Sequence, residues 1–293
     1  MELWLIFAAL AAVFAALTTV LAKIGLKQVD SNLVTAIRTI VVLVFACIMV
    51  FVVGSQHDIK NISLTTWLLI LLSGLTAGGS WLCFFRALKL GKVKNVIPID
   101  KSSTVLTMLL AFAFLGEPIS LIGAIGMGLM GVGTWLMLEL KKESLEENIK
   151  KSSKSWLLWA ILAAVFASLT AIFGRVGVAD LDATLWTALR TTVIVPLSWL
   201  VVFLTKGQKK IGKINRKNWF FLISSGVTTG VSWLFFYHAL QLGNTGHVVA
   251  IDKLSIVLTM IFARMFLGEK LSKKSTIGLI LLTGGTLLAT LLG

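Results

Sequence analysis

The feature of this sequence that most restricts its fold is an internal repeat that runs through the whole chain. When the 293-residue sequence is compared with itself, a match appears at an offset of 152 residues and continues without a gap. AAVFAALTTVLAKIG at 11–25 aligns with AAVFASLTAIFGRVG at 163–177, and IDKSSTVLTMLLAFAFLGE at 99–117 aligns with IDKLSIVLTMIFARMFLGE at 251–269. Apolar composition alone does not explain the match, because charged and aromatic residues also stay in register. These residues are Arg38 with Arg190, Trp81 with Trp233, Asp100 with Asp252, Lys101 with Lys253, and Glu117 with Glu269.

Most of the chain is too apolar to face water. Hydrophobic residues make up 57% of the sequence and charged residues 14%, and the mean hydropathy is +0.93, which a water-soluble domain of this size does not normally carry. A bilayer core needs about 20 apolar residues per helix, and ten such stretches fit the sequence. We therefore predict an all-α, polytopic membrane protein with ten transmembrane helices, near residues 3–23, 33–53, 66–88, 95–115, 119–139, 156–175, 184–204, 218–240, 246–267 and 275–292.

The repeat divides the chain into two five-helix units. We place the first unit at 1–140 and the second at 156–293, joined by the charged linker KKESLEENIKKSSKS at 141–155. Each unit has an odd number of spans, so two copies that follow one another must insert in opposite orientations. The sequence therefore predicts two inverted-topology repeats.

Basic residues mark one side of the predicted bundle. The chain has 27 lysine and arginine residues against 13 acidic ones, and most of them gather in the gaps after odd-numbered spans, as Lys206, Lys209, Lys210 and Lys213 do. By the positive-inside rule this side faces the cytoplasm, so we predict a multi-pass protein of the cell inner (plasma) membrane with both termini outside. Contact with anionic membrane lipids then explains the basic excess, and no nucleic-acid partner is expected.

Each unit carries the same ordered set of short motifs. It has a first span rich in small residues, a third span with glycine, serine and tryptophan that ends in AL-x-LG, and a fourth span that ends in LGE. This order resembles the EamA-type drug/metabolite transporter (DMT) superfamily. The strings SNLVTAIRT and IDK-x-S are similar to the branch in which the five-helix unit also occurs as a short stand-alone protein. The resemblance implies a ten-helix transporter with a central solute cavity between its two repeats. Well-known ten-helix members are thought to keep both termini in the cytoplasm, whereas the lysines here predict the reverse.

Ionisable residues inside the predicted spans come in repeat-related sets. An ionised group at mid-bilayer costs at least about 2.5 kcal/mol, so each one needs a partner, water or a route to the interface. We interpret these residues as gates or as the lining of the solute path: Arg38 with Asp100, Arg190 with Asp252, and the adjacent Lys101 and Lys253. The two lysines would offer positive charge to an anionic or zwitterionic solute. The alternative is that the pairs are neutralising salt bridges that only fix one helix against another.

Two tryptophans and two basic residues complete the candidate site. Trp81 and Trp233 end matching SG-x-T-x-G-x-SW runs and are predicted to line the cavity, where an indole offers one donor and a broad face. The alternative is a packing groove of small residues with a lipid-facing tryptophan. Arg86 and His238 occupy equivalent positions near the ends of the third and eighth spans, where a histidine could couple transport to protons. The alternative is a hydrogen-bonded structural histidine.

The fifth and tenth spans carry a turn signal and many glycines. Glu117 and Glu269 follow a glycine at the turns into these spans and are predicted to cap the next helix. The glycines allow close helix packing, either against the rest of the bundle or against a second protomer. A homodimer is therefore among the expected partners, beside the solute and the lipids.

The predicted function is secondary transport of a small metabolite, as an importer or an exporter, by alternating access of two inverted repeats. The sequence contains no Walker-type GxxxxGK[ST] loop, so ATP hydrolysis by this chain is not expected. It also lacks a metal-ligand cluster and a Ser/His/Asp set, so we predict neither an enzyme nor a cofactor or metal site. The alternatives are a membrane-embedded enzyme or other protein that handles a lipid-linked substrate, and a membrane assembly subunit without transport.

Overall fold

The computed structural model describes residues 3–26, 29–116, 118–138, 155–177, 181–242, 248, 251–252 and 254–291. Helices and short connections make up this part of the chain, and no strand occurs in it. The predicted all-α class is confirmed. The first half contains α1 (Leu3–Gly25), α2 (Ser31–Val53), the 3₁₀ helix η1 (Ser55–Asn61), α3 (Leu64–Leu90), α4 (Val93–Leu110), the π-helical η2 (Ala111–Leu115) and α5 (Leu121–Met137). The second half contains α6 (Ser155–Gly177), α7 (Ala183–Leu204), η4 (Gly207–Lys213), α8 (Arg216–Leu242), α10 (Ser255–Leu267) and α11 (Lys273–Leu291).

The repeat of the sequence is also a repeat of helices. At the offset of 152 residues, α1 falls on α6, and α3 falls on α8, with the same first and last positions. The local signals repeat as well, because Asp30 and Asp182 accept hydrogen bonds from the first turns of α2 and α7. The backbone also turns left-handed at Gly116 (φ 66°) and at Gly268 (φ 68°), which end η2 and α10. Equivalent sequence therefore produces equivalent structure in both halves.

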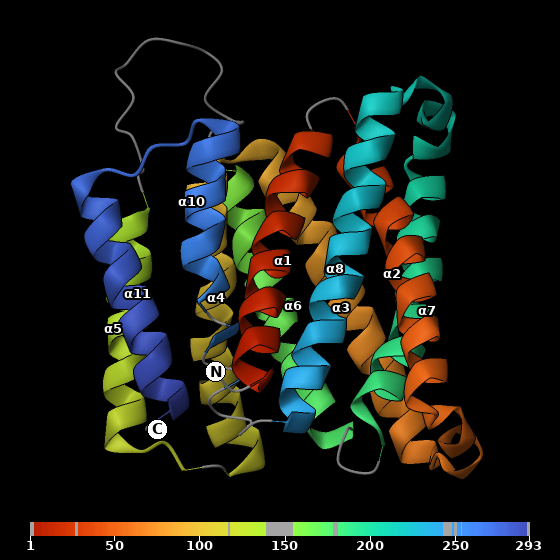
Figure 1. Ribbon diagram of the computed structural model, residues 1–293, viewed down its shortest axis with the longest axis horizontal. Helices are drawn as coiled ribbons and strands as arrows, with labels where there is room; N and C mark the ends of the chain where they lie inside the picture. Colours follow the sequence, from red (N-terminus) through yellow and green to blue (C-terminus); the bar gives the residue numbers. More distant parts are fainter. Residues whose placement is uncertain are drawn as a thin grey trace.

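The two halves run in opposite directions and interlock. In Figure 1, α1 starts at the end of the bundle where both chain termini lie, and α6 starts at the opposite end. α1 packs against α8 and α3 against α6, so the first helix of each half lies on the third helix of the other. α2 packs against α7, and α5 against α11. This pattern is that of a pseudo-two-fold axis between inverted copies.

Hydrogen bonds in these crossed pairs follow the same symmetry. The Ser232 hydroxyl of α8 donates to the carbonyl of Ala11 in α1 (2.8 Å), and at the equivalent positions Ser80 of α3 donates to Ala163 in α6 (2.9 Å). The α1–α8 and α3–α6 pairs are therefore alike in chemistry as well as in position. Threonine hydroxyls repeat the match at 2.9 Å in both halves, Thr18 with Thr228 and Thr170 with Thr76.

The outer surface of the bundle is apolar. Large hydrophobic side chains such as Leu64 (77% exposed), Phe114 (75%) and Leu121 (79%) point away from the core, which suits contact with lipid tails rather than water. Seven of the described helices are long and apolar enough to cross a membrane: α1, α2, α3, α4 with η2, α6, α7 and α8. α5 and α10 are shorter apolar helices. The structure therefore supports a multi-pass membrane protein, and the number of ten spans stays a prediction.

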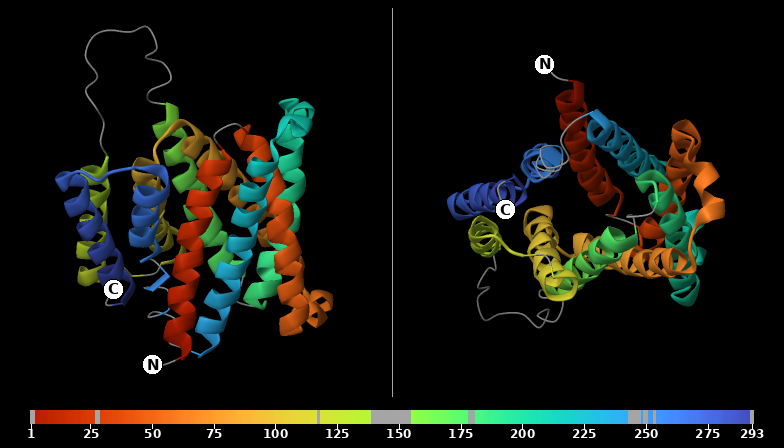
Figure 2. Two further views of the ribbon diagram at one scale, coloured as in Figure 1. Left: turned by 45° about the horizontal axis from the view of Figure 1, so that its top comes forward. Right: turned by 90° about the horizontal axis from the view of Figure 1, so that it is seen from below.

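The α5–α11 pair lies at one edge of the bundle, beside α4 and α10 (Figure 2, dark blue and yellow-green). Glycines let the two helices touch at the backbone. A Cβ atom added to Gly126 would lie 2.8 Å from the carbonyl oxygen of Gly285, and one added to Gly278 would lie 2.7 Å from the carbonyl oxygen of Gly133. These glycines therefore pack the fifth helix of one repeat against that of the other within one chain.

Candidate functional site

Arg38 is a buried cation held between the two repeats. It lies on α2, seven residues after the helix start, or about 10 Å along the axis, and 4% of its surface is exposed. Its Nη2 donates to the Thr229 hydroxyl (3.0 Å) and to the Ser225 carbonyl (3.3 Å) of α8, and its Nε donates to the Ser225 hydroxyl. Its Cζ lies 4.4 Å from the ring centroid of Phe85 in α3. Arg38 therefore connects α2 to α8 near the start of α2.

The equivalent contact in the other half is different. The repeat partner of Arg38 is Arg190 on α7, which is half-buried rather than buried. The position equivalent to Ser225 is Ser73, whose hydroxyl is buried and makes no hydrogen bond within the part of the chain that the structure describes. The position equivalent to Thr229 is Ala77, which has no hydroxyl. The hydroxyl contacts that hold Arg38 are therefore not reproduced on α3 for Arg190, which has other interactions.

The predicted carboxylate partners lie elsewhere. Asp100 is half-buried on α4 and takes part in other polar interactions, while the hydrogen bonds of Arg38 all go to α8. Among the described residues the structure does not bring Arg38 and Asp100 together. Asp252 is half-buried just before α10, and Lys253 lies outside the described residues.

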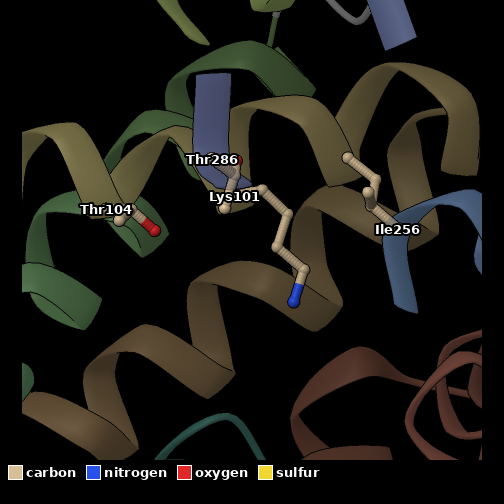
Figure 3. Close-up of a pocket in the computed structure, with 4 residues that line it drawn as sticks. All are labelled: Lys101, Thr104, Ile256 and Thr286. Atoms are coloured by element: carbon tan, nitrogen blue, oxygen red, sulfur yellow. The ribbon is translucent and has the colours of Figure 1, made fainter. Parts of the chain in front are cut away.

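Lys101 lines a small pocket at the junction of the two repeats. Its walls are Lys101 and Thr104 of α4, Ile256 of α10 and Thr286 of α11, and the space between them is too small to hold a water molecule. Figure 3 shows the Lys101 side chain extending from α4 so that its Nζ atom points away from Thr104 and Thr286. Lys101 Nζ makes no hydrogen bond or ion pair with any residue that the structure describes.

The two predicted cavity tryptophans lie in different apolar clusters. Trp81 is half-buried against the largest cluster, which includes Phe85. Trp233 is half-buried against a cluster formed by residues of α2, α3 and α7, among them Leu185 and Trp186. The structure therefore does not bring the two tryptophans together.

Arg86 and His238, the predicted coupling residues, lie near opposite ends of the bundle, because α3 and α8 run in opposite directions (Figure 1). Arg86 is half-buried. His238 is exposed, and its ring lies 5.7 Å from that of Phe7 in α1. They do not form one site.

Glu269 connects the two repeats at the end of the bundle where α1 and α3 end and α8 begins, which we call the lysine-rich end. This end carries basic residues such as Lys23, Lys89, Lys210 and Lys217. Its carboxylate accepts hydrogen bonds from the backbone N–H groups of Val93 (3.0 Å) and Lys94 (2.9 Å). These residues begin α4, so Glu269 caps a helix of the other repeat and the prediction that it caps the next helix is wrong. The next helix, α11, receives its cap from Ser272, whose hydroxyl accepts from the first turn (3.2 Å). Glu117 lies outside the described residues.

Other contacts close the same end. Lys94 Nζ donates to the Lys270 carbonyl (2.8 Å), which again joins α4 to the turn before α11. Lys210 of η4 forms an ion pair with Asp30, the cap of α2, at 3.4 Å. The first seven residues of α4 are all buried. Together with Arg38, these contacts pack the repeats tightly where the lysines gather.

Both repeats of the chain match the model of a known protein family. The family model described as "EamA-like transporter family" matches the chain twice, at residues 2–139 and 154–291, so it covers both repeats. The chain belongs to the EamA-like transporter family. It is therefore a member of a family of multi-pass membrane transporters, as the ordered motifs predicted.

Relatives of this EamA-like chain carry transporter names. It is 43% identical over 136 residues to "Uncharacterized transporter in cobO 3'region" of Sinorhizobium sp., a match that covers 46% of this chain and 96% of the relative, whose length is thus that of one repeat. It is 24% identical over 207 residues to "Uncharacterized transporter YxxF" of Bacillus subtilis (strain 168), covering 70% of this chain and 64% of that one. A solved structure titled "Crystal structure of protein" matches 97% of this chain and 98% of its own, with a TM-score of 0.66 at 17% identity, which shows the same fold.

Sequence reasoning missed several residues of this EamA-like site. Ser225 and Thr229 hold Arg38, and Thr104 stands beside Lys101, yet none of them was a candidate. A signal for the first existed, because Ser73 and Ser225 are polar residues kept at equivalent positions of two apolar helices. The described residues contain no group of three or more His, Cys, Asp or Glu side chains that could hold a metal ion.

Proposed function

We propose that this EamA-like chain is a secondary transporter that carries a small metabolite across the inner membrane by alternating access. In this proposal ten helices span the bilayer and the two repeats insert in opposite orientations. The family match and the crossed packing of α1 on α8 and of α3 on α6 support it. Two interlocked inverted copies can exchange conformations, so that a packing open to one side has a counterpart of similar energy open to the other.

The lysine-rich end is assigned to the cytoplasm. It holds the ends of α1, α3 and α7 and the start of α8, with basic residues such as Lys23, Lys89, Lys210 and Lys217. The positive-inside rule places such an end in the cytoplasm. Both termini, which lie at the other end of the bundle in Figure 1, are then outside.

The observation that carries the proposal is the unequal contact of Arg38 and of Arg190 with the third helix of the other repeat. Arg38 is buried and bonded to α8 near the lysine-rich end, whereas Arg190 is half-buried and the serine in the matching position, Ser73, makes no hydrogen bond to the described part of the chain. The surrounding pairs α1–α8 and α3–α6 are bonded alike. In alternating access, a symmetric frame takes up states in which equivalent contacts of the two halves differ.

In the proposed cycle, Arg38 leaves α8 when the cytoplasmic mouth opens. The α2–α8 contact then loosens, and Arg190 on α7 approaches Ser73 on α3 to close the outer mouth. Each arginine thereby stabilises one of the two states, so that both are needed for turnover.

Uptake by reconstituted protein tests the proposal. A thermal-shift panel of amino acids, nucleobases, organic anions and organic cations would first identify a stabilising solute, and proteoliposomes would then take it up with and without a pH gradient. We expect R38Q and R190Q each to lower uptake about tenfold or more, because each removes charged hydrogen bonds from one state. R216Q, which changes an exposed arginine at the start of α8, is the matched control. Uptake at the wild-type rate in both R38Q and R190Q would refute the gating role.

A further inference from the structure

We propose that the connector between α7 and α8, residues 206–217, binds the anionic headgroups of membrane phospholipids. This connector consists of Lys206, the 3₁₀ helix η4 and the residues that lead into the start of α8. In Figure 1 it lies at the outer edge of the bundle (teal), at the end opposite to the start of α1 and the end of α11. The inference goes beyond the proposed function and does not depend on it, because a lipid can bind this surface whether or not the chain transports a solute.

The first observation is the charge of this connector compared with its copy in the other repeat. Residues 206–217, KGQKKIGKINRK, contain six lysine and arginine residues and no acidic residue. The equivalent residues 54–65, GSQHDIKNISLT, contain one lysine and one aspartate. Both segments form a 3₁₀ helix of seven residues after the second helix of their repeat. The fold therefore does not require the basic residues, since the same connection forms without them.

The second observation is the backbone of Lys206. Its φ is 55°, in the left-handed region that disfavours residues with a Cβ atom, and among the described residues it is the one non-glycine residue with a positive φ. The other repeat has Gly54 (φ 81°) at the equivalent position. The positive-inside rule explains basic residues in this connector, but not at the position where glycine fits best. A lysine at this position therefore indicates a use of its charge beyond setting the topology.

The third observation is the direction in which the side chains of the connector point. Residues three positions apart share a face of a 3₁₀ helix. Ile211 and Ile214 pack against the largest apolar cluster, whereas Lys210 and Lys213 are exposed. Lys210 pairs with Asp30 at 3.4 Å. The other basic side chains are exposed and make no hydrogen bond or ion pair within the part of the chain that the structure describes: Lys206, Lys209, Lys213, Arg216 and Lys217. These cations can donate to the oxygen atoms of a phosphate group.

Apolar side chains flank the connector on both helices. Phe203 (54% exposed) and Leu204 (73%) end α7, and Phe220 (66%) lies in the first turns of α8. Both helices are long and apolar enough to cross a membrane, so these side chains lie where acyl chains begin. A phospholipid can contact the cations with its phosphate and the apolar side chains with its acyl chains, which a soluble phosphate cannot do. The excess of positive charge favours a lipid with a net negative charge over a zwitterionic lipid.

Lipid titration of the purified full chain in a neutral detergent tests the proposal, with native mass spectrometry and thermal shift as readouts. The probes are phosphatidylglycerol and phosphatidylcholine with the same acyl chains, and inorganic phosphate. We expect phosphatidylglycerol to bind more tightly than phosphatidylcholine, and its binding to weaken about tenfold or more in the triple variant K209Q/K213Q/K217Q. Added salt should also weaken this binding, because these charges are exposed.

The triple variant K270Q/K273Q/K274Q is the matched control. It removes the same charge from exposed lysines near the start of α11, so we expect it to weaken the binding by less than about threefold. Equal binding of the two lipids, a response to inorganic phosphate alone, or an equal loss in the two triple variants would overturn the proposal.

K206G tests the proposal through a single residue. It places glycine where the other repeat has Gly54, so we expect it to melt no lower than the wild type in the absence of lipid. It also removes one cation, so phosphatidylglycerol should bind about fivefold more weakly. K60Q removes the lysine of the equivalent connector and should leave this binding unchanged. Binding of wild-type strength in folded K206G, or an equal loss in K60Q, would count against the connector as the lipid site.

Discussion

Replacing Gly133 by alanine tests the backbone contact between α5 and α11. The added Cβ would lie 2.5 Å from the backbone nitrogen of Leu282 and 2.7 Å from the carbonyl oxygen of Gly278. Ordinary contact begins near 3.4 Å, so α11 must move away by about 0.9 Å, because no side chain can rotate out of the way. Overpacking of this kind costs about 1–3 kcal/mol, and the higher helix propensity of alanine returns up to about 1 kcal/mol. We expect a net loss of about 1–2 kcal/mol.

Thermal unfolding of the purified protein, followed by tryptophan fluorescence, measures this loss. For a chain of this size 1 kcal/mol corresponds to about 2 °C in Tm, so G133A should melt about 2–4 °C below the wild type. Gly128 is the matched control on the same helix, because a Cβ there meets nothing within 4 Å. G128A gains helix propensity without a clash and should melt slightly higher than the wild type. If G133A melts at or above G128A, the close packing of α5 on α11 is not what these glycines provide.

Three further predictions concern the lysine-rich end and the orientation of the chain. E269A removes the cap from α4 and should lower the stability by about 0.5–2 kcal/mol, with a smaller loss in E269Q, which keeps one acceptor; equal melting of E269A and the wild type would contradict the cross-repeat cap. K210A breaks an exposed ion pair and should lower the stability by less than about 1 kcal/mol, because exposed ion pairs contribute little. A fall in Tm that corresponds to a larger loss would contradict this expectation. Single cysteines at Lys210 and Asp58, placed after Cys47 and Cys83 are replaced, should be labelled from opposite sides of the membrane, with Asp58 reached by an impermeant reagent in intact cells; labelling from the same side would contradict the predicted topology.

The sequence predicted the symmetry of this fold because the symmetry is itself a sequence property. An offset that pairs Arg38 with Arg190 and Asp100 with Asp252 requires two like units, and the caps at Asp30 and Asp182 and the left-handed glycines follow from local residue types. The helical class followed in the same way, since only helices satisfy the backbone of apolar stretches about 20 residues long in lipid.

The partners of the site residues could not be predicted in this way. Periodicity shows which residues share a face of one helix, but Arg38 finds Ser225 on the other repeat, 187 positions away, and Glu269 finds the start of α4, 176 positions away. Such contacts depend on how two copies interlock, which no local rule contains. A repeat also gives equivalent residues equivalent predictions, so it cannot indicate that Arg38 alone is held by a serine and a threonine of the other repeat.

The matched and the unmatched contacts of the two halves together restrict how the protein can move. α1–α8 and α3–α6 keep the same hydrogen bonds in both halves, so each pair has no reason to separate when the proposed states exchange. α2 and α7 pack against each other, and each carries the arginine whose bonding differs between the halves. A rocking of the α2–α7 pair against the two crossed pairs would release Arg38 from α8 and bring Arg190 towards α3, without breaking any of the matched bonds. When Arg38 leaves α8 in this motion, a contact of Arg190 with α3 replaces the lost one only in part, because Ala77 stands where Thr229 provides a hydroxyl in the other half. In the proposed cycle, the state closed at the lysine-rich end keeps the Thr229 hydrogen bond, and the other state has no hydroxyl at this position to replace it.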